Sequence, residues 1–182
     1  MKSIRLQAII FLGNPGREYE ATRHNVGWKV AATLPWQNQG QWQKKFQGQW
    51  TTAHWAGQKL FLLLPETYMN LSGESGRAMS DYFRIPPESW LAVHDDVELP
   101  FGEVKGQFGG GLGGHNGLRS LKQHWSTSDF YRLRIGVGRP QHGSLADYVL
   151  SRFTADEEGQ WPQILSRAGE ILQKMLEFPL ET

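Results

Sequence analysis

The sequence contains no cysteine. This absence excludes a thiol nucleophile, a disulfide framework and a thiolate-bound metal, and it suits a reducing compartment. Long apolar runs are also missing: Met1–Arg5 lead into a short apolar stretch that ends at Gly13, with no small-residue cleavage site and too little length to span a bilayer. We therefore expect a cytoplasmic protein that is neither exported nor inserted into a membrane.

Motifs for several enzyme classes are absent or incomplete. The six histidines do not pair at the spacing of a His-Glu-x-x-His metal helix, so we expect no metal. Gly73-Glu74-Ser75-Gly76 is one residue short of the serine-hydrolase pattern Gly-x-Ser-x-Gly and falls in a predicted helix. The run 109–114 fits Gly-x-Gly-x-x-Gly, but it comes late in the chain, so a nucleotide site stays only an alternative to a loop that lets a bulky polymer approach the backbone.

Charge and length point to one domain with a polarised surface. The 182 residues are too few for two ordinary domains, so we expect a single domain over residues 1–182. Residues 1–50 hold seven basic and two acidic side chains, and residues 101–142 hold six and two, whereas residues 51–100 and 143–182 each hold three basic and seven acidic ones. Such segregation suits a one-sided phosphate-binding surface, although solvated charge without function gives the same pattern.

Hydrophobic periodicity predicts alternating strands and helices. Expected strands are 6–12, 51–55, 59–64, 90–93, 104–108 and 131–137, the second and third forming a hairpin. Expected helices are one that follows a Thr22 N-cap, 72–83, 118–125, and a long C-terminal helix opened by the capping box of Thr154 and Glu157. This order predicts a single-domain α/β fold with a twisted, mostly parallel (mixed) sheet and helices on both faces.

Polar side chains gather at the predicted strand ends, where open α/β sheets place their working groups. An imidazole ordinarily titrates near neutrality, so His24 can take a proton from water, and a nearby carboxylate would fix its tautomer. Asp95 is the best candidate for that carboxylate, with Asp96 as the alternative. Asn14, Asn70 and Asn116 carry both donors and acceptors and suit a carbonyl or a water molecule, although each is also a common turn residue.

Six ordered blocks give the chain a resemblance to bacterial peptidyl-tRNA hydrolases over nearly all of its length. They are Leu12-Gly13-Asn14-Pro15-Gly16 with Tyr19, Thr22-Arg23-His24-Asn25-Val26-Gly27, Tyr68-Met69-Asn70-Leu71-Ser72-Gly73, His94-Asp95-Asp96 with Leu99-Pro100, Gly109-Gly110-Gly111 through Gly114-His115-Asn116-Gly117, and Arg132 through Pro140. One block alone has little weight, but the ordered set is specific. The resemblance implies an enzyme that hydrolyses the ester between a peptide and tRNA and so returns free tRNA to translation.

The resemblance also implies roles for individual residues. His24 is the general base that activates water, Asp95 holds it, and Asn14 distinguishes a peptide-bearing amine from a free one. The positions that contact the tRNA 3′ end or the peptide are Tyr19, Tyr68, Met69, Asn70 and Asn116. The family works without a cofactor or metal, and we expect a monomer.

Two positions depart from the family pattern. Tyr68 stands where phenylalanine is common, a change that keeps the ring. Gln107 stands where the family often has a lysine that grips the tRNA phosphate together with the arginine matched by Arg134. Lys105, two residues earlier on the same side of the strand, is the expected substitute in this phosphate clamp. The alternatives left open are an RNA-binding protein without catalysis and a nucleotide-dependent enzyme.

Overall fold

The structure, a computed structural model, describes residues 5–178. Its strands are β1 (Ala8–Phe11), β2 (Gln43–Lys45), β3 (Gly48–Trp55), β4 (Gln58–Pro65), β5 (Trp90–Asp96), β6 (Val104–Phe108) and β7 (Tyr131–Gly136). The α-helices are α1 (Val26–Thr33), α2 (Ser72–Phe83), α3 (Asn116–Trp125), α4 (Leu145–Val149), α5 (Ala155–Gly159) and α6 (Trp161–Glu177). Short 3-10 turns are η1 (Arg23–Asn25), η2 (Met69–Leu71) and η3 (Pro87–Ser89).

The strands form one mixed sheet in the order β2-β3-β4-β1-β5-β7-β6. The central strands β4, β1, β5 and β7 run parallel, whereas β2, β3 and β6 pair antiparallel at the two edges. β4 is the neighbour of β1 on one side and β5 is its neighbour on the other. The direction in which the chain adds strands to the sheet therefore reverses at β1. In sheets of this kind the crevice at the carboxyl ends of the strands is the usual binding site.

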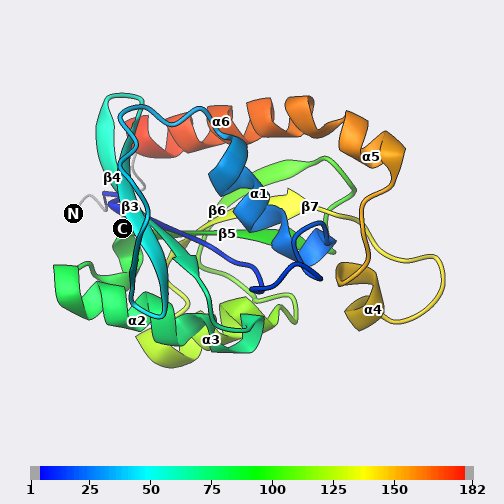
Figure 1. Cartoon of the computed structure of the whole chain (residues 1–182), viewed down its shortest axis with the longest axis horizontal. Coiled ribbons are helices and arrows are strands. Elements are labelled where there is room, and N and C mark those ends of the chain that lie inside the picture. The colour runs from blue at the N-terminus through cyan, green and yellow to red at the C-terminus, as the bar shows by residue number, and fades with distance from the viewer. Residues whose placement is uncertain (1–4, 179–182) are drawn as a thin grey trace.

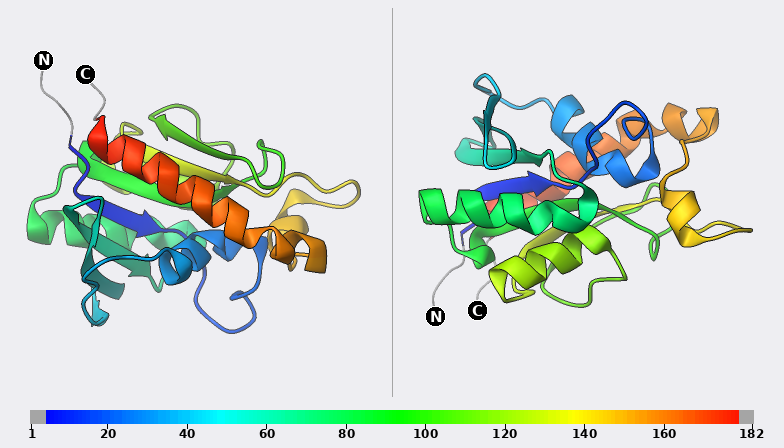
Figure 2. Two further views of the ribbon diagram at one scale, coloured as in Figure 1. Left: turned by 90° about the horizontal axis from the view of Figure 1, so that it is seen from above. Right: turned by 60° about the horizontal axis from the view of Figure 1, so that its bottom comes forward.

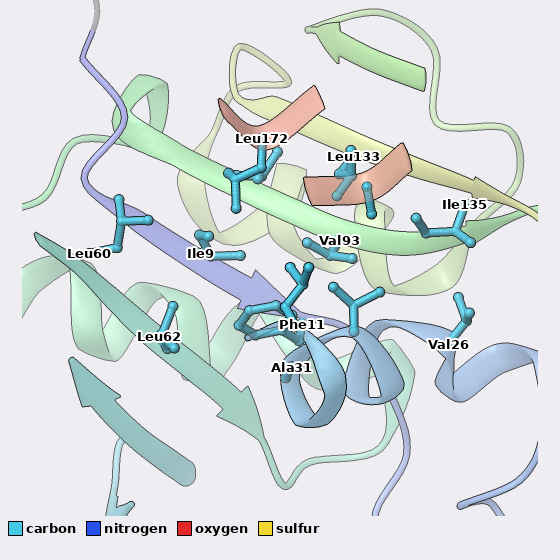
Figure 3. Packing of buried hydrophobic residues seen from close by; sticks show 14 of the residues in the cluster. Ile9, Phe11, Val26, Ala31, Leu60, Leu62, Val93, Leu133, Ile135 and Leu172 are labelled. Carbon is cyan, nitrogen blue, oxygen red and sulfur yellow. The ribbon is translucent and has the colours of Figure 1, made fainter. Parts of the chain in front are cut away.

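Helices cover both faces of the sheet, as Figures 1 and 2 show, and alternating side chains of the strands bury against them. Ile9 and Phe11 of β1 point toward α1 and α6, where they pack with Val93, Leu133 and the α6 residue Leu172 (Figure 3). The alternate β1 residues Ala8 and Ile10 point to the opposite face, which α2 and α3 cover. The predicted α/β fold, with a mostly parallel mixed sheet between helices, is confirmed.

Several predicted elements agree closely with the structure. The helix 72–83 and the strand 104–108 have the expected bounds, and the hairpin of β3 and β4 turns at Ala56 and Gly57. Both turn residues have positive φ angles, 49° and 77°, as a tight two-residue hairpin requires. The additional edge strand β2 lies within residues 37–49, a stretch rich in glutamine and tryptophan for which the sequence predicted no element.

The predicted C-terminal helix is two helices. The capping box of Thr154 and Glu157 forms as expected, but it opens only the short α5. A new helix, α6, begins at Trp161 because Pro162 lacks an N–H and fits only the first turn of a helix. Similarly, Thr22 does not cap the first helix with its side chain; its hydroxyl donates to the carbonyl of Tyr19, 2.7 Å away.

No helix within residues 5–178 combines the length and the apolar character needed to cross a membrane. Of the N-terminal segment that the sequence prediction considered, Met1–Ile4 lie outside the described residues.

Candidate active site

The site forms where the central strands end. Asn14 follows β1, Met69 follows β4, and Asp95 is the last residue but one of β5. The first helix sits directly on this edge: a Cβ on Gly27 would lie 2.7 Å from the carbonyl oxygens of both Leu12 and Val93. The close approach places the turn η1, which precedes α1, beside the end of β5.

His24 and Asp95 are in contact. Nδ1 of His24 lies 2.8 Å from Oδ2 of Asp95, and their side chains are 11% and 2% exposed. Since a carboxylate only accepts, Nδ1 carries the proton, and Nε2 of the neutral ring is the basic nitrogen. The alternative carboxylate, Asp96, is instead paired with Arg134 at 2.8 Å.

A second imidazole, not expected from the sequence, holds the other oxygen of the same carboxylate. Nε2 of His115 lies 2.8 Å from Oδ1 of Asp95. Nδ1 of His115 accepts the backbone N–H groups of Gly117 and Leu118, at 3.1 and 3.3 Å, and so caps the N-terminus of α3. Because Nδ1 accepts, Nε2 must be the donor, and the tautomer of His115 is fixed. The His24 and His115 rings are 5.0 Å apart.

The two imidazoles keep Asp95 ionised. Burial alone would raise the pKa of this carboxyl, but electrostatic attraction to His115 and His24 and the hydrogen bonds they donate lower its pKa below the usual range. The neighbouring His94 behaves differently. Burial, and then the unfavourable electrostatic interaction with His115, lower the pKa of His94 to about 4, while its Nδ1 donates to the Asp95 carbonyl at 2.8 Å. His94 is therefore a neutral ring at physiological pH.

Asn14 is held from both sides. Its backbone N–H donates to Oδ1 of Asn25, and its carbonyl accepts from Nδ2 of Asn25, both at 2.9 Å. The side-chain oxygen of Asn14 accepts the backbone N–H of Met69 at 2.7 Å. With this oxygen engaged, the group that Asn14 has left to offer is its amide NH2. The sequence did not single out Asn25, although its position next to His24 placed it within reach.

The predicted residues occupy two zones. A cleft of about 230 Å³ brings together His24, Asp95 and Asn116, with the predicted glycine loop at its rim. Asn14 and Met69 form a second group that is bonded to η1 through Asn25. Met69 reaches toward the first group, since its sulfur would lie 2.6 Å from a Cβ on Gly117. The remaining predicted contacts differ in exposure: Tyr68 and Asn70 are exposed and Tyr19 is half-buried.

A wall of this cleft comes from a segment that the sequence did not predict as a helix. Leu145, Ala146 and Val149 of α4 line it. Arg23, the neighbour of His24, holds that segment in place. Its guanidinium donates to Ser151 Oγ and to Glu157 Oε1, each at 2.6 Å. It also stacks over the ring of Tyr148, 4.4 Å from the ring centroid. The position of α4 is thus fixed from the same turn that carries His24.

The glycine loop is supported by a buried arginine. The guanidinium of Arg132 donates to the carbonyls of Gly110 and Gly111, and burial lowers its pKa, with the charge of Arg134 adding to the effect. Lys105 of β6 lies directly opposite Arg134 of β7 in the strand register, so both side chains project from the same face of the sheet.

Arg134, one residue of the predicted phosphate clamp, is oriented by two acceptors. Arg134 donates to Asp96 Oδ2 at 2.8 Å and to Gln107 Oε1 at 3.1 Å. Gln107 itself donates to the carbonyl of Gly109 at 2.7 Å. The glutamine at the position of the family's lysine therefore holds the arginine and the loop together.

One group in the described part of the chain has metal-ligand geometry, with ligand atoms of His24, Asp95 and His115 within 4.8 Å of one another. Ligation through Nε2 of a neutral His115 would put a proton on its Nδ1 and face it against the N–H groups of Gly117 and Leu118. The donor chemistry thus favours a hydrogen-bonded chain over a metal centre.

The two enzyme alternatives are not supported by local geometry. In a dinucleotide site the first N–H groups of the helix after the glycines bind the pyrophosphate, but here His115 already occupies them. The strand before the loop, β6, is also antiparallel to its neighbour. Ser75, from the incomplete serine-hydrolase pattern, is buried and donates to the carbonyl of Phe46 at 2.6 Å.

Comparison with known proteins gives the same answer from sequence and from structure. The family profile described as peptidyl-tRNA hydrolase matches residues 8–182. Among relatives, the peptidyl-tRNA hydrolase of Bacillus pumilus is 43% identical over 94% of this chain and 93% of its own. That of Geotalea daltonii is 41% identical over 93% and 90%. The crystal structure of peptidyl-tRNA hydrolase from Acinetobacter baumannii superposes with a TM-score of 0.84 at 32% identity, covering 97% of this chain and 91% of that one.

Proposed function

The chain belongs to the peptidyl-tRNA hydrolase family and is a hydrolase of that class, and on this basis we propose that His24 activates the water that cleaves peptidyl-tRNA. The observation that carries the proposal is the 2.8 Å hydrogen bond between His24 Nδ1 and Asp95 Oδ2, which leaves Nε2 as the base. The substrate is the ester between tRNA and a peptide or an N-blocked amino acid.

The proposed reaction is a direct hydrolysis without a covalent intermediate. Water attacks the ester carbonyl carbon while His24 Nε2 takes its proton, and Asp95 stabilises the imidazolium that forms. The carbonyl–oxygen ester bond then breaks, and the proton passes from His24 to the departing ribose oxygen. The products are a peptide acid and tRNA with its terminal hydroxyl restored. We assign stabilisation of the oxyanion to asparagine amides of the site and to N–H groups of the glycine loop, a contribution of about 3–4 kcal/mol per donor in other enzymes.

Selection for a blocked amine follows from the orientation of Asn14. Met69 takes its side-chain oxygen, so Asn14 presents an NH2 donor. A peptidyl group offers a carbonyl acceptor next to its α-nitrogen, whereas a free aminoacyl group offers an ammonium, which only donates. The NH2 donor of Asn14 therefore pairs with the carbonyl of a peptidyl group. Opposite the ammonium of a free aminoacyl group it faces another donor and forms no hydrogen bond.

For the substrate, we assign contacts with the tRNA 3′ end or the peptide to Tyr19, Tyr68, Asn70 and Asn116, with Met69 lining the site. The exposed ring of Tyr68 suits stacking on an unpaired base. Lys105 and Arg134, adjacent on one sheet face, form the phosphate clamp, with Gln107 orienting the arginine. We further propose that the enzyme acts in the cytoplasm as a monomer and without a cofactor.

The deciding experiment is incubation of the protein with N-acetyl-aminoacyl-tRNA and free aminoacyl-tRNA side by side. Cleavage of the blocked substrate alone is expected. Binding of tRNA without cleavage of either would favour the non-catalytic RNA-binding alternative. Saturable NAD or ATP binding would revive the nucleotide-dependent one.

A further inference from the structure

We propose that His115 is a positioning residue for the reaction, holding the Asp95 carboxylate through Nε2–H while it anchors α3 through Nδ1. The inference rests on the proposed function, because it concerns how Asp95 supports His24. Its starting point is that each oxygen of Asp95 meets one imidazole at 2.8 Å, His24 at Oδ2 and His115 at Oδ1.

Burial makes the second imidazole necessary. The Asp95 side chain is 2% exposed and that of His115 is 8% exposed. With so little solvent contact, water is poorly placed to replace a missing donor at Oδ1, and an unpaired carboxylate oxygen in this environment is costly. Without His115 the carboxylate is free to turn its second oxygen toward another donor, and His24 loses its fixed partner.

The two histidines reach Asp95 from opposite faces of the sheet. His24 lies in η1 just before α1, which packs on one face, and His115 immediately precedes α3, which packs on the other (Figure 1). Their meeting at the end of β5 ties the two helical layers to one carboxylate. Because Asn116 follows His115 in the chain, the hydrogen bond between His115 and Asp95 also positions Asn116 relative to His24.

The two nitrogens of His115 have separate functions: Nε2 donates to Asp95 and Nδ1 caps α3. Two substitutions remove these functions one at a time. Asparagine places its amide near the position of Nδ1, so His115→Asn keeps an acceptor for the α3 N-terminus and loses the donor to Asp95. Glutamine reaches the position of Nε2, so His115→Gln keeps the donor and loses the cap.

The test measures steady-state cleavage of N-acetyl-aminoacyl-tRNA and thermal unfolding for the wild type and both variants. We expect His115→Asn to melt close to the wild type and to lose about tenfold or more in kcat with KM little changed, the size expected for one charge-assisted hydrogen bond. We expect His115→Gln to melt lower and to keep the higher kcat of the two.

The outcomes distinguish this inference from the proposed function. If the wild type cleaves the substrate but His115→Asn matches its kcat, or if His115→Gln is the less active variant, the positioning role is wrong and the hydrolase assignment stands. If the wild type does not cleave the substrate at all, the proposed function fails, and this inference fails with it.

Discussion

Asn14 takes part in three buried hydrogen bonds, two through its backbone to Asn25 and one through its side-chain oxygen to Met69. Neighbouring residues, not the asparagine itself, thus determine which end of its amide is free. In the proposed function this orientation sets the discrimination between blocked and free amines.

Replacing Asn14 by aspartate tests that discrimination with almost no change in shape. The carboxylate still accepts the Met69 N–H but presents an acceptor where the NH2 was, opposite the carbonyl of a blocked substrate. We expect kcat/KM for N-acetyl-aminoacyl-tRNA to fall at least about tenfold and the preference over free aminoacyl-tRNA to shrink. An unchanged ratio between the two substrates would show that Asn14 does not select.

The sequence supplied the identity of the central residues and proposed Asp95 as the partner of His24, with Asp96 left open, but it did not supply the second partner of Asp95. Motif spacing and strand ends singled out His24, Asp95 and Asn14, because such groups gather where strands stop. His115 and Asn25 were passed over, since each stands beside a more conspicuous residue and acts only through a contact across the fold. A histidine immediately before a helix was the one available sign of a side-chain cap at His115.

At the scale of elements, the seating of α1 on the sheet controls where His24 stands. Gly27 leaves no room for a side chain, because a Cβ there would lie 2.7 Å from two strand carbonyls and 2.9 Å from the Leu12 nitrogen. Any larger residue must lift α1, and with it η1, away from β5.

We therefore expect Gly27→Ala to lower the free energy of unfolding by about 1–3 kcal/mol, the usual cost of overpacking, and also to reduce kcat. Urea unfolding and tRNA cleavage measure the two effects. Gly159→Ala is the matched control: its Cβ would meet nothing within 4 Å, so a change within about 0.5 kcal/mol is expected. Equal stability of both variants would refute the close-packing explanation.

Element prediction succeeded where one local signal dominated. The helix 72–83 and the strand 104–108 followed from periodicity alone. The break between α5 and α6 was missed because the capping box of Thr154 and Glu157 lies shortly before the apolar stripe that begins at Trp161, although Pro162 marked the new start. The five-residue α4 is too short for a periodic signal, and it is placed by Arg23, a contact between distant parts of the chain.

For the molecule as a whole, buried titratable groups link folding to pH. His94 is 2% exposed and its pKa is lowered from 6.5 to about 4 by burial and by the unfavourable electrostatic interaction with His115. Between these values the unfolded chain binds a proton that the folded protein does not, so stability falls as the pH falls. Asp95, whose pKa is also lowered, loses its stabilising contribution at still lower pH, below its unfolded value.

We expect the free energy of unfolding to drop by roughly 2 kcal/mol from His94 alone between pH 7 and pH 5. Urea titrations at both pH values measure it. His94→Asn is the control, because its amide still donates to the Asp95 carbonyl but does not titrate in this range. The pH dependence of the variant should be smaller by that amount, and identical dependence in both proteins would rule out His94 as its source.

The global fold was predictable because alternating strands and helices of this length have few arrangements. The site was predictable only in part, since the resemblance implied a tRNA enzyme and the sequence proposed His24 and Asp95 as partners, but only the fold brings that imidazole against that carboxylate. That juxtaposition is the central claim of the mechanism.

The most direct test of this claim is single-turnover cleavage of N-acetyl-aminoacyl-tRNA by the wild type and by His24→Asn. Asparagine keeps a donor near the position of Nδ1 for Asp95 and removes only the basic Nε2. The mechanism predicts a rate lower by about 10²–10⁴-fold with tRNA affinity nearly unchanged. A His24→Asn rate within about threefold of the wild type would contradict it, because no general base at Nε2 would then be needed.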